Sequence, residues 1–182
     1  NDPLTPCLFF PAGAGQAVEE AAFAAAMATD IPYLIASVAA SGQYSYAATA
    51  MGIPGLLLER GHSGHCREEW IQGYQRDLRL LLQHFAMVDL GERAPIGPKT
   101  VCRETVYLVS GHKGLWYPAI EAGQRVATGD RLGSVEDFYG EPVADYRAAA
   151  AGTLFSLRAN PSIHTGTPHA ASGSAGHRPG VT

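Results

Sequence analysis

This sequence contains little charge of either sign and no long apolar run. Charged residues make up 16% of the 182 positions, and the only lysines are Lys99 and Lys113. With a formal net charge of -4 and no cluster of basic residues, the chain lacks the composition of a nucleic-acid-binding protein. No apolar stretch approaches the roughly 18 residues that a transmembrane helix needs. We therefore expect neither nucleic acid nor a membrane as a partner.

Cysteine is also scarce. The three cysteines, Cys7, Cys66 and Cys102, lie far apart and form no Cys-x-x-Cys pair. A disulfide framework normally has an even number of cysteines in a shorter chain, so we expect three reduced thiols in a cytoplasmic protein. The sequence begins at Asn1 without an initiator methionine or a signal-like segment, and we expect it to be a piece of a longer protein.

The first half alternates predicted strands with predicted helices. Short apolar runs next to glycine and proline predict three strands, at residues 7–10, 33–37 and 55–59. Apolar periodicity predicts three helices, at residues 16–28, at residues 45–51, and from His65 or Arg67 to about Phe85. This order predicts parallel strands joined by right-handed crossovers, and hence an α/β domain over residues 1–90.

The longest predicted helix is amphipathic. Its apolar residues recur at steps of three and four, which predicts a single buried face. That face would consist of Trp70, Ile71, Tyr74, Leu78, Leu81, Leu82 and Phe85. The polar residues expected on the opposite, solvent-facing side are Arg76, Asp77, Arg79 and Gln83.

The second half has a different texture. Residues 91–99 are rich in proline and glycine and predict a linker. Segments 101–109 and 115–120 are β-like, so we expect a small all-β domain over residues 100–171. The polar residues 172–182 have nothing to bury, and we expect them to be disordered.

The β-half contains an internal repeat. Residues 122–132 resemble residues 159–169, and each copy places a β-branched residue three positions before a glycine. These pairs are Val126 with Gly129 and Ile163 with Gly166. Two copies of one hairpin predict a compact sandwich or barrel built from two similar halves.

Glu59 is the strongest candidate for chemistry. It ends an apolar run that has the pattern of a buried strand in a parallel sheet, and α/β sheets carry their sites beyond the carboxyl ends of such strands. A carboxylate whose pKa is adjusted by burial is a suitable general base. The alternative is a structural Glu59 that caps the next helix or pairs with Arg60.

Several neighbours of Glu59 are secondary candidates. His62, His65 and Cys66 could form a metal site with Glu59, although the spacing is not that of a zinc finger, and a simple polar loop is the alternative. Cys66 could be a nucleophile, but a surface thiol is the simpler interpretation. Three residues could contact a substrate, namely Arg60, His62 and Tyr44; the last of these, like Tyr46, could instead be packed in a core or pocket wall.

Taken in order, several segments resemble the succinylglutamate desuccinylase/aspartoacylase family, a branch of the zinc carboxypeptidase-like hydrolases. The matching segments in the first half are Pro-Cys-Leu-Phe-Phe-Pro at 6–11 and Gly-Ile-Pro-Gly-Leu-Leu-Leu-Glu-Arg-Gly at 52–61. Those in the second half are residues 114–118, 121–133 and 137–141. The resemblance implies the C-terminal part of a carboxypeptidase-like α/β/α sandwich, followed by a small all-β barrel-sandwich hybrid domain.

The resemblance also implies an activity, a zinc-dependent amidohydrolase or deacylase acting on an N-acyl amino acid or a related small molecule. In such an enzyme zinc activates a water, and a glutamate at the position of Glu59 takes its proton. The family's zinc ligands, a His and a Glu followed by a second His, would lie upstream of residue 1. We therefore expect Zn2+ as the cofactor, no metal ligand in this chain, and little activity from the chain by itself.

The alternative is a non-catalytic binding or oligomerisation module. In either case an incomplete sheet would expose an unpaired edge and an apolar face. We expect poor solubility or self-association, with a homo-oligomer as one outcome.

Overall fold

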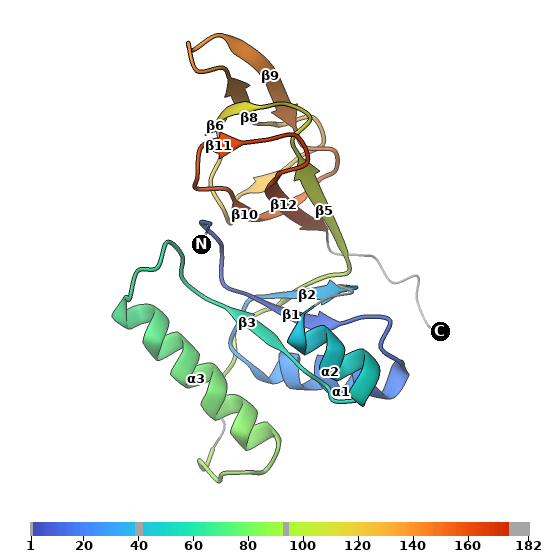
Figure 1. The fold of residues 1–182 in the computed structure, drawn as a ribbon. Coiled ribbons are helices and arrows are strands. Elements are labelled where there is room, and N and C mark those ends of the chain that lie inside the picture. Colours follow the sequence, from blue (N-terminus) through green and yellow to red (C-terminus); the bar gives the residue numbers. More distant parts are fainter. Residues whose placement is uncertain (1, 39–41, 93–94, 175–182) are drawn as a thin grey trace. The chain divides into compact units, whose positions relative to one another are not determined.

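The computed structural model describes residues 2–38, 42–92 and 95–174 and shows a mixed α/β chain with three helices and several sheets. The chain forms two compact units (Figure 1). The α/β unit comprises Pro6–Arg60 and Cys66–Arg103, and the β unit comprises residues 2–5, 61–65 and 104–174. None of the helices in the described residues is long and apolar enough to cross a bilayer.

The α/β unit is built on one four-stranded sheet with the strand order β3-β1-β2-β4. Its strands are β1 (Cys7–Pro11), β2 (Tyr33–Ser37), β3 (Leu57–Glu59) and β4 (Thr100–Cys102). Its helices are α1 (Gln16–Ala28), α2 (Gln43–Met51) and α3 (Glu68–His84). Strands β1, β2 and β4 are parallel, as the alternation of strands and helices predicted for the first two.

The prediction that the run before Glu59 is a buried parallel strand was wrong. Strand β3 pairs antiparallel with β1, and Leu57 is 40% exposed. A short apolar run indicates that a strand will form, but its direction depends on the path of the preceding connection. Because β3 is at an edge of the sheet, it does not need to be buried on both faces.

The core of the α/β unit lies between α1 and one face of the sheet. Leu8, Phe10 and Leu34 pack there against Ala22 and Ala26. The alanines have small side chains and are fully buried, so the helix backbone can approach the strands closely. This explains why an alanine-rich segment forms the central helix of this unit.

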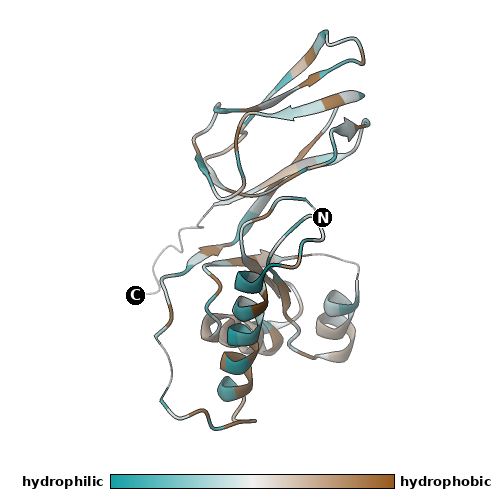
Figure 2. Ribbon diagram, turned by 90° about the vertical axis from the view of Figure 1, so that its left-hand side faces the viewer, coloured by the Kyte–Doolittle hydropathy of each residue, from teal (hydrophilic) through white to brown (hydrophobic). Residues whose placement is uncertain are grey.

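The face of α3 that is buried differs from the predicted one. Asp77, which was predicted to face the solvent, is fully buried. Leu80, which was assigned to neither face, is only 5% exposed. Four residues of the predicted buried face are exposed instead, namely Ile71, Leu78, Leu82 and Phe85. Figure 2 shows hydrophilic and hydrophobic residues along this helix. Periodicity finds an apolar stripe correctly, but it does not specify which side of the helix meets the sheet.

We call these four exposed residues, Ile71, Leu78, Leu82 and Phe85, the α3 stripe, and we expect it to drive self-association. Replacing Leu78 and Leu82 together by glutamate places two like charges within the stripe, and should shift the chain toward monomer. Sedimentation velocity over a range of concentrations would measure the change.

The matched control is Gln72→Glu with Gln83→Glu, which adds the same charge to α3 outside the stripe. This control should leave the association unchanged. A wild-type chain that is monomeric throughout the concentration range would contradict the prediction.

The β unit contains two four-stranded antiparallel sheets, with the orders β5-β12-β10-β7 and β11-β6-β8-β9. The strands of the first sheet are β5 (Glu104–Val109), β7 (Arg125–Val126), β10 (Gly152–Leu157) and β12 (Pro168–Ser174). The strands of the second are β6 (Gly114–Pro118), β8 (Arg131–Glu136), β9 (Pro142–Arg147) and β11 (Ser162–Ile163). Trp116, Val135, Leu154 and Ile163 lie at the centre of a single hydrophobic core.

The division of the chain differs from the expected one in three places. Residues 2–5 and 61–65, which were assigned to the α/β domain, belong to the β unit. Residues 100–102, which were assigned to the β domain, form β4 and pair with β2. The boundary between the two units along the sequence therefore follows Arg103. Residues 172–174, which were assigned to a disordered tail, belong to β12, because they pair with β5 and β10. The rest of the expected tail, residues 175–182, lies outside the described residues.

The internal repeat is visible in the hydrogen bonds of the two turns. Gly129 N–H donates to the carbonyl of Ala148 (2.8 Å), and Ala148 N–H donates to the carbonyl of Asp130 (2.9 Å). In the second copy, Gly166 N–H donates to the carbonyl of Ser110 (2.8 Å), and Ser110 N–H donates to that of Thr167 (2.9 Å). Both glycines have positive φ values, 89° and 86°, which only glycine adopts readily. The β unit therefore consists of two equivalent halves.

Candidate active site

Glu59 is the last residue of β3 and lies directly opposite Cys7 of β1. Because β3 is antiparallel to β1, Glu59 lies beside the amino end of β1, and not beside the carboxyl ends of the parallel strands. The rule that suggested Glu59 from the sequence therefore does not describe its position. The case for Glu59 depends on its surroundings and on the family resemblance.

The Glu59 side chain is half-buried. Burial disfavours its charged form and raises the pKa of its carboxyl group above the ordinary value of 4.5. A carboxyl group with a raised pKa exchanges a proton more readily near neutral pH than an exposed one. The surroundings of Glu59 thus suit proton transfer.

This raised pKa predicts a dependence of stability on pH. The folded chain holds the Glu59 proton more tightly than the unfolded chain, so proton binding stabilises the fold. This stabilisation is complete below the unfolded pKa of about 4.5, and it is lost as pH rises through the folded pKa. Glu59→Gln removes this titration. Its free energy of unfolding should therefore increase relative to wild type as pH rises from about 4 to about 7, measured by urea unfolding. A difference that is independent of pH would contradict this.

Two buried thiols share the face of the sheet on which Glu59 lies. Cys7 pairs with Glu59, and Phe9, two residues further along β1, points to the same face as Cys7. Phe9 pairs with Ile35 of β2, and Ile35 pairs with Cys102 of β4, so Cys102 lies on this face as well. Burial, reinforced by the negative charges of Glu59 and Cys102, raises the pKa of the Cys7 thiol to about 12. Burial also raises the pKa of Cys102 to about 11. Both thiols are protonated at neutral pH, so neither is a nucleophile or a thiolate ligand there.

These environments predict unequal thiol reactivity. All three cysteines are free, and only Cys66 is exposed. At pH 8, a thiol reagent such as Ellman's reagent should modify Cys66 rapidly and the two buried thiols only after unfolding. The fast reaction should disappear in Cys66→Ser. Rapid modification of two or three thiols in the folded chain would show that the sheet face is open.

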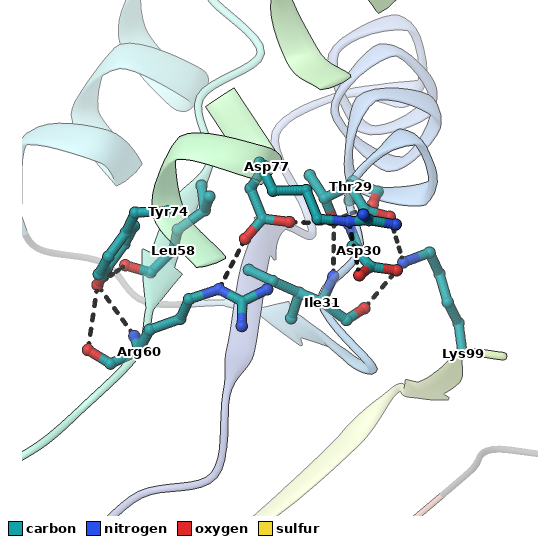
Figure 3. Close-up of polar contacts among 10 residues, drawn as sticks. Thr29, Asp30, Ile31, Leu58, Arg60, Tyr74, Asp77 and Lys99 are labelled. Atoms are coloured by element: carbon teal, nitrogen blue, oxygen red, sulfur yellow. Dashed lines mark hydrogen bonds and ion pairs between the residues drawn. The ribbon is translucent and has the colours of Figure 1, made fainter. Parts of the chain in front are cut away.

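Arg60 forms a buried ion pair with Asp77 (Figure 3). The Nε of Arg60 donates to Oδ2 of Asp77 at 2.7 Å, and the two side chains are 13% and 0% exposed. The other oxygen of Asp77, Oδ1, accepts the backbone N–H of Asp30 at 2.8 Å. This pair joins α3 to the residue that follows Glu59. The structure thus gives Arg60 an anchoring role, and its contact with a substrate stays a prediction.

Tyr74 and Gly73 complete this anchor. The backbone N–H of Arg60 donates to the Tyr74 hydroxyl at 2.9 Å, and that hydroxyl lies 3.3 Å from the carbonyl oxygen of Leu58. Gly73 allows the Arg60 side chain to lie against α3, because a Cβ there would be 3.0 Å from Nη1 of Arg60. The backbone on both sides of Glu59 is therefore held by α3.

Lys99 extends the polar network toward β4. Its Nζ donates to the carbonyl oxygens of Thr29 (2.7 Å) and Ile31 (2.8 Å) (Figure 3). Burial lowers the pKa of Lys99, and the positive charge of Arg60 lowers it further. The negative charges of Asp30 and Asp77 act in the opposite direction. The network links the residues that follow α1 and β3 to the middle of α3.

Sequence reasoning missed Asp77 and placed it on the solvent-facing side of the helix. One signal was available. Gly73 lies inside a predicted helix, where glycine costs about 1 kcal/mol relative to alanine, and such a glycine suggests that another group approaches closely. The partner of Asp77 could not be found from local sequence.

The other predicted site residues are distributed over both units. Tyr44 lies in the first turn of α2, and its carbonyl oxygen would be 3.4 Å from a Cβ at Gly55, just before β3. His62 belongs to the β unit, and its Nδ1 is 3.0 Å from the Ser63 hydroxyl. Within residues 2–38, 42–92 and 95–174, no three His, Cys, Asp or Glu residues are grouped as a metal site. The structure does not assemble Glu59, His62, His65 and Cys66 into one.

No protein-family model and no curated protein matches this chain. Solved structures do match it. A succinylglutamate desuccinylase from Silicibacter sp. TM1040 is 28% identical, with a TM-score of 0.77 over 93% of this chain and 53% of that chain. The product-bound ectoine utilization protein EutE (DoeB) from Ruegeria pomeroyi is 27% identical, with a TM-score of 0.80 over the same shares.

A succinylglutamate desuccinylase/aspartoacylase from Rhodobacter sphaeroides shares the fold, with a TM-score of 0.81 at 20% identity over 97% of this chain and 56% of that chain. The chain thus spans about half the length of the solved structures that it matches. These structures confirm the resemblance that the sequence motifs predicted.

Proposed function

We propose that this chain, a structural relative of the succinylglutamate desuccinylase/aspartoacylase family, carries the proton-transferring carboxylate of an enzyme that hydrolyses the amide bond of an N-acyl amino acid or a related small molecule. Glu59 is that carboxylate. The observation that carries the proposal is its half-buried position and raised pKa, at the point in the sequence where the family motif has its glutamate.

Glu59 would act twice in one turnover. In its charged form it accepts a proton from the attacking water, and the resulting carboxylic acid then donates that proton to the leaving amine. A pKa raised by burial favours both steps, because it brings the two forms closer in free energy near neutral pH. The anchor made by Arg60, Tyr74 and Asp77 would hold Glu59 in position for both transfers.

The resemblance implies zinc, which would supply electrophilic activation of the amide and of the water. The described residues do not fit a zinc site by themselves. They contain no group of three or more suitable side chains, and burial keeps the Cys7 and Cys102 thiols protonated. We therefore assign no metal ligand to this chain and propose that residues outside it hold the ion.

We further propose Tyr44 and His62 as residues that contact the substrate, with the outer nitrogens of Arg60 as a third candidate. The ion pair with Asp77 uses Nε of Arg60. Three free thiols agree with a cytoplasmic location.

A hydrolysis assay tests the proposal. N-acetylaspartate, N-succinylglutamate and N-acetyl diamino acids should be offered to the chain alone and to a polypeptide of the relatives' full length that contains it. We expect turnover by the longer polypeptide and little or none by the chain alone, whose described residues lack a metal site. Failure of the longer polypeptide on every N-acyl substrate, with zinc bound, would refute the proposed activity.

One observation favours a second candidate function, that of an association module. The α3 stripe exposes Leu78 and Phe85 by 54% and 51%, which is unusual for a helix of a monomeric protein. Association without hydrolysis would support this alternative.

A further inference from the structure

The β unit contains a cavity of about 500 Å³ that lies entirely within that unit. Two short segments contribute three consecutive residues each to its lining, at positions 120–122 and 157–159. The remaining wall is largely apolar and includes the buried Trp116. His62, which is also a candidate substrate contact of the proposed hydrolase, lines it as well.

These two segments are equivalent in the internal repeat. The alignment of residues 122–132 with 159–169 pairs Ala122 with Ala159, and one position earlier it pairs Glu121 with Arg158. The cavity is therefore lined by the same element from each half of the β unit. The equivalent positions carry opposite charges.

Neither charge has an ion-pair partner among the residues that the structure describes. Nε of Arg158 is buried and has no hydrogen-bond partner in the described part of the chain. Within the same residues, the side chains of Arg158 and Glu121 take part in no ion pair, with each other or with any other residue. A buried guanidinium nitrogen without an acceptor is unfavourable, and it is commonly satisfied by a bound carboxylate.

We infer that this cavity binds a small zwitterion, with its carboxylate at Arg158, its ammonium group at Glu121 and its apolar part against Trp116 and Leu157. Two separate charges of opposite sign match a ligand that carries both, whereas a simple anion would be repelled by Glu121. Free amino acids have this chemistry. The inference rests on Glu121 and Arg158 and does not require hydrolase activity, although the cavity shares His62 with the proposed substrate contacts.

Tryptophan fluorescence provides the test. Trp70 and Trp116 are the only tryptophans, so Trp70→Phe leaves a signal that reports the cavity. The full chain in this background should be titrated with leucine and with 6-aminohexanoate, in which the two charges are close together and far apart, respectively. N-acetylleucine, which has no ammonium group, and leucinamide, which has no carboxylate, serve as probes that lack one charge.

We expect at least one zwitterion to bind, and Arg158→Gln and Glu121→Gln each to weaken it about tenfold, since a charge-assisted hydrogen bond is lost in each. Glu121→Gln should also abolish any preference for leucine over N-acetylleucine. Arg158→Gln should likewise abolish any preference for leucine over leucinamide. The controls Arg125→Gln and Glu141→Gln change charges outside the lining and should bind as the parent does. The inference is overturned if neither zwitterion binds, or if the probes that lack one charge bind as tightly.

Discussion

Glu59→Gln is expected to lower kcat/KM for an N-acyl amino acid by about 10²–10⁴-fold, which is the usual contribution of general acid–base catalysis. Glutamine has the size of glutamate but cannot take a proton from water or return it to the leaving amine. The loss should appear mainly in kcat, because the change removes a proton transfer and leaves substrate binding largely intact. The measurement requires a polypeptide of the relatives' full length, with the variant and the parent compared at equal zinc content.

The matched control is Glu20→Gln, which makes the same chemical change at an exposed glutamate of α1. It should retain the activity of the parent. If Glu59→Gln also retained full activity, Glu59 would be a structural residue at the end of β3, and the proposed mechanism would fail even if hydrolysis itself were confirmed.

Asp77→Ala is expected to destabilise the α/β unit by about 3–5 kcal/mol, because it leaves a buried arginine without its counter-charge. Arg60 would keep a side chain that is only 13% exposed, and the N–H of Asp30 would lose its acceptor. Urea unfolding followed by circular dichroism at 222 nm would report this, because the three helices found in the described residues all belong to the α/β unit.

The control is Arg76→Ala, which removes the nearby ion pair between Arg76 and Asp30, whose side chains are 45% and 28% exposed. Exposed pairs contribute about 0–1 kcal/mol, so this variant should be much closer to the parent. If Asp77→Ala fails to fold, the double variant Asp77→Leu with Arg60→Met should restore folding, since an apolar pair can replace a buried ion pair. Equal effects of Asp77→Ala and Arg76→Ala would contradict the anchoring role.

Most elements of the α/β unit could be predicted from the sequence. The bounds of α1 and β2 agree with the structure, because glycine, proline and apolar periodicity act over a few residues. The direction of β3 and the orientation of α3 were predicted wrongly. Both depend on contacts between residues far apart in the chain, such as Arg60 with Asp77, and local patterns contain no information on those contacts.

For the candidate site, Glu59 was predicted from a motif, but the geometric reason first offered for it was wrong. The anchor around it was not predicted at all. A buried aspartate and a lysine bonded to two carbonyls have the same local sequence signature as surface residues, so their roles become visible only when their surroundings are known.

The amino-acid sequence alone determined where most strands and helices of the α/β unit form, that the β unit has two related halves, and which family the chain resembles, because these properties are encoded in spacing and motifs along the chain. Tertiary structure decided that Glu59 is half-buried opposite Cys7, that Asp77 is inside and the α3 stripe outside, and that Glu121 and Arg158 line one cavity. Burial and charge pairing are set by distance in space, and the free energies that govern pKa values and binding depend on those distances.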